Sequence, residues 1–221
     1  MSIQTTSRLE LVSHLPENTV VTFHDVNWEE YEEFLRDIGE ARGLHVSYDD
    51  GKLQVMTISS EHESYAWFIG KLMATISLRL RIEIRFFGSA TIKKKRKKKG
   101  NEPDACFYVQ SASVIGNKVK LDFETDPPPD IALEIDIHHE SRAKLPIYGA
   151  LGVPEVWIFD GRKLTIYLLR GDQYVEGMQS RALPMLSDAV LTDFLTRMPK
   201  DGELKTLLAF EQWVMSQPPR A

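Results

Sequence analysis

The chain is poor in cysteine and in long apolar runs. Its 221 residues include one cysteine, Cys106, so no disulfide can form within the chain, which fits a reducing compartment. No apolar run approaches the roughly 18 residues that a membrane-spanning helix needs, and the opening MSIQTTSRLELV lacks the basic and apolar segments of a secretion signal. We therefore expect a cytoplasmic protein.

Several motifs of common active sites are also missing. The sequence contains no glycine-rich phosphate loop, no Gly-x-Ser-x-Gly turn and no Cys-x-x-Cys pair. These absences argue against an NTPase, a serine hydrolase and a zinc ribbon. His138 and His139 have no further histidine or cysteine at metal-ligand spacing, so we interpret them as loop residues.

The composition is that of an ordinary globular protein. Hydrophobic residues make up 43% and charged residues 27% of the chain. The length suits one domain with its own core. We expect an N-terminal arm at 1–18, a single domain at 19–200 and a C-terminal helix at 201–221 that packs on the domain.

Positive charge is concentrated in one segment, KKKRKKK. The net charge is −5, so the chain without these seven residues carries −12. A basic segment on an acidic body can hold a polyanion locally. The alternative is a solvated loop within a hairpin. The residues concerned are Lys93, Lys94, Lys95, Arg96, Lys97, Lys98 and Lys99.

The chain is organised around residues 127–160. After three prolines, apolar residues alternate with Ala132, Glu134 and Asp136, a pattern that predicts a strand. Asp130, Glu134 and Asp136 then share one face. An unpaired carboxylate is costly inside a sheet, so we expect a compensating charge. A divalent cation bound through oxygens would serve, and so would a nearby lysine.

A lysine follows this strand on a predicted helix. Ser141 is a plausible cap, Pro146 is tolerable in the first turn and Gly152 is a plausible end. Lys144 would then lie near the helix start, close to the end of the acidic strand. Residues 156–160 read as another buried strand, whose pairing with the first the pattern leaves open.

The remaining elements follow from periodicity and turn signals. The long helix should bury Trp67, Ile69, Leu72, Met73, Ile76 and Leu80. A helix capped by Asp25 or Asn27 should end at Gly43. We expect strands at 20–23, 44–48, 53–58, 82–92, 104–110, 164–169 and 173–175, and helices after Asp25, at 61–80, from Asp188 or Thr192 to 198, and at 204–215.

Two further acidic residues are candidates for the site. Asp104 follows Pro103 at a strand entrance, thirty residues before Glu134, which is the spacing of a two-carboxylate metal site. Asp104 could equally be a turn residue. Glu63 lies in the first turn of the long helix, where it could either approach a metal or favour the helix dipole.

Four motifs, in this order, resemble the Uma2 family. They are SSEHE at 59–63, EPD at 102–104, PPPDIALEIDI, and KLPIYGALGVPEVWIFD. This family, also called DUF820, is a restriction-endonuclease-like branch of the PD-(D/E)XK nuclease superfamily, and the resemblance covers about 20–195. The superfamily places a lysine two residues after the second acid, where this chain has Asp136. Uma2-like sequences carry it on the following helix, which corresponds to Lys144.

The resemblance implies an α/β fold, with a central mixed sheet flanked by helices, and a nuclease activity on DNA. Mg²⁺ or Mn²⁺ would be held by Asp104, Glu134 and the carbonyl of Ile135. Lys144 would orient the water or neutralise developing charge, and Asp136 would position Lys144. Glu63 and Asp130 would be additional acids.

Other interpretations stay open on the sequence. Lys144 could form a buried ion pair with Glu134 or Asp136 and do no catalysis. The chain could be a catalytically silent nucleic-acid-binding module, a phosphoesterase for a small substrate, or a structural homodimer.

Overall fold

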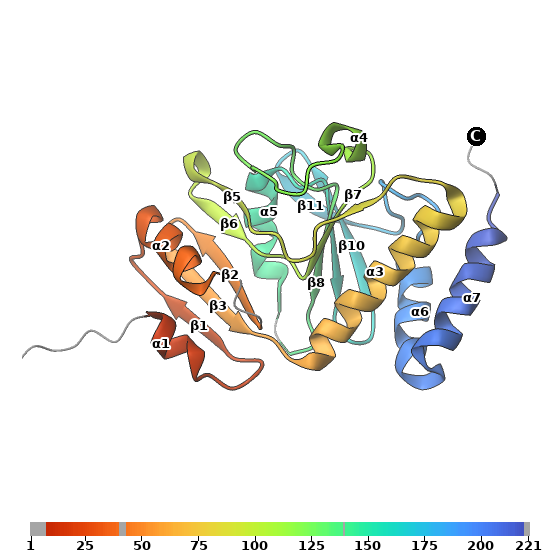
Figure 1. The fold of residues 1–221 in the computed structure, drawn as a ribbon, viewed down its shortest axis with the longest axis horizontal. Helices are drawn as coiled ribbons and strands as arrows, with labels where there is room; N and C mark the ends of the chain where they lie inside the picture. The colour runs from red at the N-terminus through yellow and green to blue at the C-terminus, as the bar shows by residue number, and fades with distance from the viewer. Residues whose placement is uncertain (1–7, 40–42, 139, 219–221) are drawn as a thin grey trace, which may run out of the picture.

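The structure, a computed structural model, describes residues 8–39, 43–138 and 140–218. Over these ranges it contains two β-sheets and seven α-helices (Figure 1). The chain passes directly from the last strand of the first sheet into the second sheet through residues 102–104. Asp104 therefore lies where the two sheets join.

The first sheet has five strands in the order β1-β3-β2-β6-β5, all antiparallel. One face is covered by α1 (Arg8–Ser13) and α2 (Trp28–Ile38), with Tyr31 and Phe34 in the shared core. A 3-10 turn, Lys95–Lys97, joins β5 to β6. The strands are β1 (Val20–Phe23), β2 (Leu44–Asp49), β3 (Lys52–Thr57), β5 (Ile92–Lys94) and β6 (Lys99–Asn101).

The second sheet has six strands in the order β11-β10-β9-β8-β7-β4 and is mixed. The central pair β8–β9 is parallel, and the other pairs are antiparallel. Every residue of β8 and β9 is buried. The strands are β4 (Arg85–Phe86), β7 (Ala105–Tyr108), β8 (Ile131–Ile135), β9 (Glu155–Phe159), β10 (Leu164–Arg170) and β11 (Gln173–Gly177).

Helices cover both faces of the second sheet. On one face lie α3 (Ser60–Leu80), α6 (Asp188–Asp201) and α7 (Glu203–Met215), which share the largest core with β7 to β10 (Figure 1). On the other face lies α5 (Leu145–Leu151), which follows a 3-10 turn, Arg142–Lys144. A short helix, α4 (Ala112–Ile115), interrupts the loop before β8. None of the described helices is both long and apolar enough to cross a membrane.

Most predicted elements are confirmed, including both hairpins, the long helix and the central strand–helix–strand unit. Asn27 caps α2 with a reciprocal capping box, and Gly152 ends α5 in the left-handed conformation. The open pairing is resolved, because β8 and β9 are parallel neighbours. Phe210 and Val214 of α7 are fully buried.

Five predictions of local structure are wrong. The region 82–92 holds only β4 and the start of β5, because its alternation is imperfect. The segment before β1 includes α1, whose Val12 is buried. Trp67 lies on the outer face of α3 and is 60% exposed. Helix α2 ends at Gly39 rather than Gly43, since Gly39 adopts a positive φ of 54°. The Ser141 hydroxyl does not cap a helix.

Candidate active site

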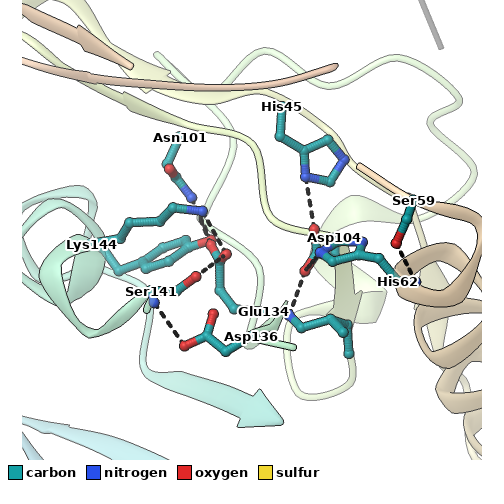
Figure 2. A network of polar contacts seen from close by, with 11 residues as sticks. His45, Ser59, His62, Asn101, Asp104, Glu134, Asp136, Ser141 and Lys144 are labelled. Atoms are coloured by element: carbon teal, nitrogen blue, oxygen red, sulfur yellow. Dashed lines mark hydrogen bonds and ion pairs between the residues drawn. The ribbon is translucent and has the colours of Figure 1, made fainter. Parts of the chain in front are cut away.

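Glu134 is the centre of a buried hydrogen-bond network at the end of β8 (Figure 2). Its Oε2 accepts from the ammonium of Lys144 at 2.7 Å and from the hydroxyl of Ser141 at 3.0 Å. Its Oε1 accepts from the amide of Asn101 at 3.0 Å and from the hydroxyl of Tyr148. Four donors therefore hold a carboxylate that is 1% exposed.

The protonation of this network follows from its charges. Burial would lower the pKa of Lys144, but the negative charges of Glu134 and Asp104 outweigh it, and the pKa is raised. Burial, together with Glu134, raises the pKa of Tyr148 well above its usual range. Both groups therefore keep their protons near neutral pH and act as donors to Glu134.

Asp104 is the centre of a second cluster, at the start of β7. Its Oδ2 accepts from the backbone N–H of Ile135. His45 of β2 places Nδ1 at 2.7 Å from Oδ1, and His62 of α3 places Nε2 at 3.2 Å from Oδ2 (Figure 2). Neither imidazole is aligned for a good hydrogen bond, so both contacts are essentially electrostatic.

The charges of this second cluster reinforce one another. Burial would raise the pKa of Asp104, but the positive charge and contact of His45 outweigh it, and the pKa is lowered. Burial would lower the pKa of His45, but Asp104 outweighs it, and the pKa is raised. Asp104 is therefore ionised, and its charge favours a protonated His45.

The two carboxylates are neighbours because of strand register. In the antiparallel pair β7–β8, Ala105 lies opposite Leu133, and the N–H of Asp104 donates to the carbonyl of Leu133. Asp104 thus lies beside Glu134 on the adjacent strand. His45 and Asn101 reach these residues from the first sheet (Figure 2). The site is therefore built between the two sheets.

Asp136 binds the loop that follows β8. Its Oδ2 accepts from the backbone N–H of Ser141 at 2.7 Å, and no hydrogen bond joins it to Lys144 within the described residues. Its Oδ1 is buried and has no hydrogen-bond partner among the residues that the structure describes. Burial, with the charge of Glu134 nearby, raises its pKa to about 6. Asp136 holds the loop after β8, and its negative charge also helps to raise the pKa of Lys144. A role in positioning Lys144 stays a prediction.

The two additional acids lie outside the network. Asp130, at the other end of β8, accepts from the N–H groups of Val109 and Ser111 and from the Ser111 hydroxyl. It ties a loop in place. Glu63 is exposed, and its neighbour His62 is the α3 residue that reaches Asp104. His138 is exposed near Glu61, and His139 lies outside the described residues.

Most of the basic segment is paired within the chain. Lysines 93, 95, 98 and 99 form ion pairs with carboxylates of α2 and of the β2–β3 turn, and Lys94 donates to the carbonyl of Leu151. No ion pair joins Arg96 or Lys97 to a carboxylate of the described ranges. The pairs are Lys93–Glu32, Lys95–Glu29, Lys98–Asp50 and Lys99–Asp49.

Access to Lys144 is narrow, whereas His45 of the Asp104 cluster also lines a larger cavity of about 860 Å³. A cavity of about 200 Å³ reaches His45, Ser141 and Lys144 from the side of β2 and β3. Lys144 is 9% exposed. A substrate group must therefore enter a small opening to meet the lysine.

For a divalent cation the two carboxylates have suitable chemistry but are already engaged. Hard oxygens suit Mg²⁺ and Mn²⁺, and Asp104 Oδ1 is a buried acceptor without an aligned hydrogen bond. Glu134 accepts from four donors, which fills the roughly four lone-pair positions of a carboxylate. Among the described residues, no three or more His, Cys, Asp or Glu side chains are grouped to hold a metal. A cation at Glu134 must replace one of its donors.

The sequence predicted Asp104, Glu134 and Lys144 as site residues. It did not predict four of the residues that contact them. Tyr148 could have been found, because it lies four residues after Lys144 on the same helical face. His62 lies three residues after the N-cap Ser59 and directly before Glu63, which the sequence pattern favoured as the site residue of this helix. His45 and Asn101 carry no local signal, since they meet the site only when the two sheets close.

A central mixed sheet flanked by helices is the architecture of the restriction-endonuclease-like fold, and this chain has that fold. A crystal structure titled as a putative nuclease belonging to DUF820, from Anabaena variabilis, matches with a TM-score of 0.51 and 16% identity. The match covers 74% of this chain and 97% of that chain.

The chain belongs to the Uma2 family, described as "Putative restriction endonuclease", whose model matches residues 28–195. A comparison with curated proteins gives no match. The resemblance seen in the sequence is thus confirmed, and it supports a nuclease function in general terms.

Proposed function

We propose that the chain is a divalent-cation-dependent endonuclease that hydrolyses phosphodiester bonds in DNA, with its centre at Asp104, Glu134 and Lys144. One observation carries the proposal. A buried lysine lies 2.7 Å from a carboxylate on one central strand, and a second carboxylate lies beside it on the next. This arrangement occurs in a chain whose family model describes a nuclease.

The chemistry needs a stabilised phosphoryl charge and a positioned water. A bound Mg²⁺ or Mn²⁺, held by Asp104 and Glu134, would polarise the phosphate. The chain itself brings the ammonium of Lys144, which Glu134 keeps protonated and fixes in direction. Asn101 and Tyr148 hold Glu134 in turn. Lys144 can thus bind a phosphoryl oxygen or orient the attacking water.

A phosphoesterase for a small substrate is a second candidate. The cavity of about 200 Å³ at Lys144 is small even for a ligand pocket, since such pockets usually measure roughly 300–1,000 Å³. A compact phosphate ester fits so narrow an opening better than an intact duplex does. The observation favours this candidate without any role for the basic segment.

The deciding experiment compares hydrolysis of plasmid DNA, single-stranded DNA and a small phosphodiester, each with Mg²⁺ or Mn²⁺. We expect DNA cleavage by the wild type and a loss of about 10²–10³-fold in Glu134→Gln, as for removal of one charge-stabilising group. The matched control is Glu155→Gln, which alters an equally buried glutamate on β9. It should keep its cleavage rate per folded molecule.

Two other outcomes would each support a different function, and a third would identify an effect on stability. Hydrolysis of the small ester alone supports the phosphoesterase. Absence of cleavage with both metals and all substrates contradicts the nuclease and supports a silent nucleic-acid-binding module. Equal losses in Glu134→Gln and Glu155→Gln would show that general destabilisation, rather than the site, explains the result.

A further inference from the structure

The basic segment is a structured hairpin rather than a loose loop. Strand β5 ends at Lys94, the 3-10 turn spans Lys95–Lys97, and Lys98 returns the chain in a left-handed conformation with φ of 49°. Consecutive cations repel one another, so a fixed conformation needs compensating charge. The structure provides that charge from outside the hairpin.

Four carboxylates supply the compensation, two from α2 and two from the β2–β3 turn. Lys93 and Lys99 pair with Glu32 and Asp49 at partly buried positions. Lys95 lies 3.0 Å from Glu29, and Lys98 lies 3.3 Å from Asp50.

These last two pairs, Lys95–Glu29 and Lys98–Asp50, are highly exposed, with side chains 62–71% accessible. Exposed pairs contribute little to stability, because water and salt screen their charges. They can therefore exchange with another anion at little cost to the fold.

The hairpin leads directly into the candidate site. Strand β6 begins at Lys99 and ends at Asn101, whose amide binds Glu134. Two residues of a strand span about 7 Å. Lys93 and Lys95 also line a groove of about 780 Å³, whose other charged residues are of both signs: Arg36 and Lys120, and Glu32, Glu102, Asp122 and Glu124. An anionic chain along the hairpin would thus pass close to the buried lysine network.

We propose that this hairpin is the backbone-phosphate contact of the nucleic acid, held in a self-neutralised state by Glu29, Glu32, Asp49 and Asp50. The inference rests on the proposed function, because DNA is the polyanion concerned. The carboxylates occupy positions on the lysines that phosphate oxygens would take. DNA must displace them, so the free chain binds polyanions weakly and selects those that engage the whole hairpin.

The test measures binding rather than cleavage, on full-length protein without a divalent cation, by fluorescence anisotropy of a labelled oligonucleotide at low salt. The variant Glu29→Gln/Glu32→Gln/Asp49→Asn/Asp50→Asn leaves Glu30, which forms the α2 capping box, unchanged. Asp50 has a φ of 39°, which asparagine tolerates. We expect this variant to bind about tenfold more tightly than the wild type, since four competing ion pairs are removed.

A matched control removes the same number of paired carboxylates far from the hairpin. The variant Asp193→Asn/Asp201→Asn/Glu203→Gln/Glu211→Gln changes residues that pair with Lys71, Arg79 and Arg197 on α3 and α6. Its net charge changes equally. Equal tightening in both variants would reduce the effect to overall charge and overturn the proposal, as would no tightening in either.

A second set of variants keeps the proposal separate from the nuclease activity. Replacing Lys93, Lys95, Lys98 and Lys99 by glutamine should make the negative slope of log K against log salt shallower. For duplex DNA the change should be about 0.9 for each phosphate that the hairpin no longer neutralises. An unchanged slope would overturn the proposal even if the Glu134-dependent cleavage is real. If the fourfold acidic variant does not fold, Glu29→Gln/Asp50→Asn alters only the two exposed pairs and should still tighten binding.

Discussion

Two buried glutamates on the parallel pair β8–β9 show how differently a fold can hold the same group. Glu134, near the end of β8, and Glu155, at the start of β9, are each 1% exposed. Glu155 accepts from the Trp157 indole and from the backbone N–H groups of Arg181 and Ala182. Within the described ranges, Glu134 accepts only from side chains, and one of these donors is the ammonium of Lys144.

The difference separates a carboxylate held mainly by the backbone from one held entirely by described side chains. Backbone donors come with the fold and stay in place when a neighbouring side chain changes. Side-chain donors can move or exchange for a ligand, which the function proposed for Glu134 requires. The Glu134 end of β8 is also the carboxyl end of a central strand, where open α/β sheets bind ligands.

Removal of the Lys144 ammonium should have the largest effect on stability. Lys144→Met leaves the buried charge of Glu134 without its ion partner, and we expect a loss of about 3–5 kcal/mol in unfolding free energy. The double variant Glu134→Gln/Lys144→Met should recover part of that loss. Arg181→Met keeps the backbone N–H that binds Glu155 and removes only an exposed hydrogen bond to the Leu169 carbonyl, so it should change stability by less than about 1 kcal/mol. Urea unfolding of the four proteins checks this, and similar losses in both single variants would contradict the distinction.

Asp136 should give the Glu134 end its own pH dependence. Its pKa rises from 3.8 to about 6 on folding, so the folded state binds the proton more tightly. Asp136 therefore costs stability above pH 6, and the cost disappears as the pH falls towards 4. Asp136→Asn should gain about 1–3 kcal/mol at pH 7 and almost nothing at pH 4. Parallel stability curves for variant and wild type between pH 4 and 7 would refute the assignment.

The smallest expected effect concerns one hydroxyl. Ser141→Ala removes a 3.0 Å hydrogen bond to Glu134 but keeps the backbone N–H that binds Asp136. We expect a loss of about 1 kcal/mol, with cleavage reduced less than in Glu134→Gln. Differential scanning calorimetry would measure the first, and initial rates the second. A loss of stability as large as that in Lys144→Met would mean that the Ser141 hydroxyl stabilises Glu134 as strongly as the Lys144 ammonium does.

Local sequence patterns predicted the Glu134 half of the site better than the Asp104 half. Alternation placed Glu134 in a buried strand, and helix signals placed Lys144 just beyond it. No local sequence pattern indicates that the Ser141 hydroxyl donates to Glu134 instead of capping the helix. His45 was beyond prediction because it belongs to another sheet, and its contact with Asp104 depends on how the sheets meet. The prediction that Trp67 is buried was wrong because α3 carries apolar residues on several faces, so the pattern does not single out the buried face.

The two halves of the site also differ in chain separation. Ser141, Lys144 and Tyr148 lie within 14 residues of Glu134, whereas the imidazole partners of Asp104 come from β2 and α3. Closing a short segment costs less chain entropy than joining distant ones. We therefore expect the Glu134 half to assemble early in folding and to survive partial opening. A destabilising change in the first sheet would withdraw His45 from Asp104 and Asn101 from Glu134. Glu134 would keep its three donors from the following segment, Ser141, Lys144 and Tyr148.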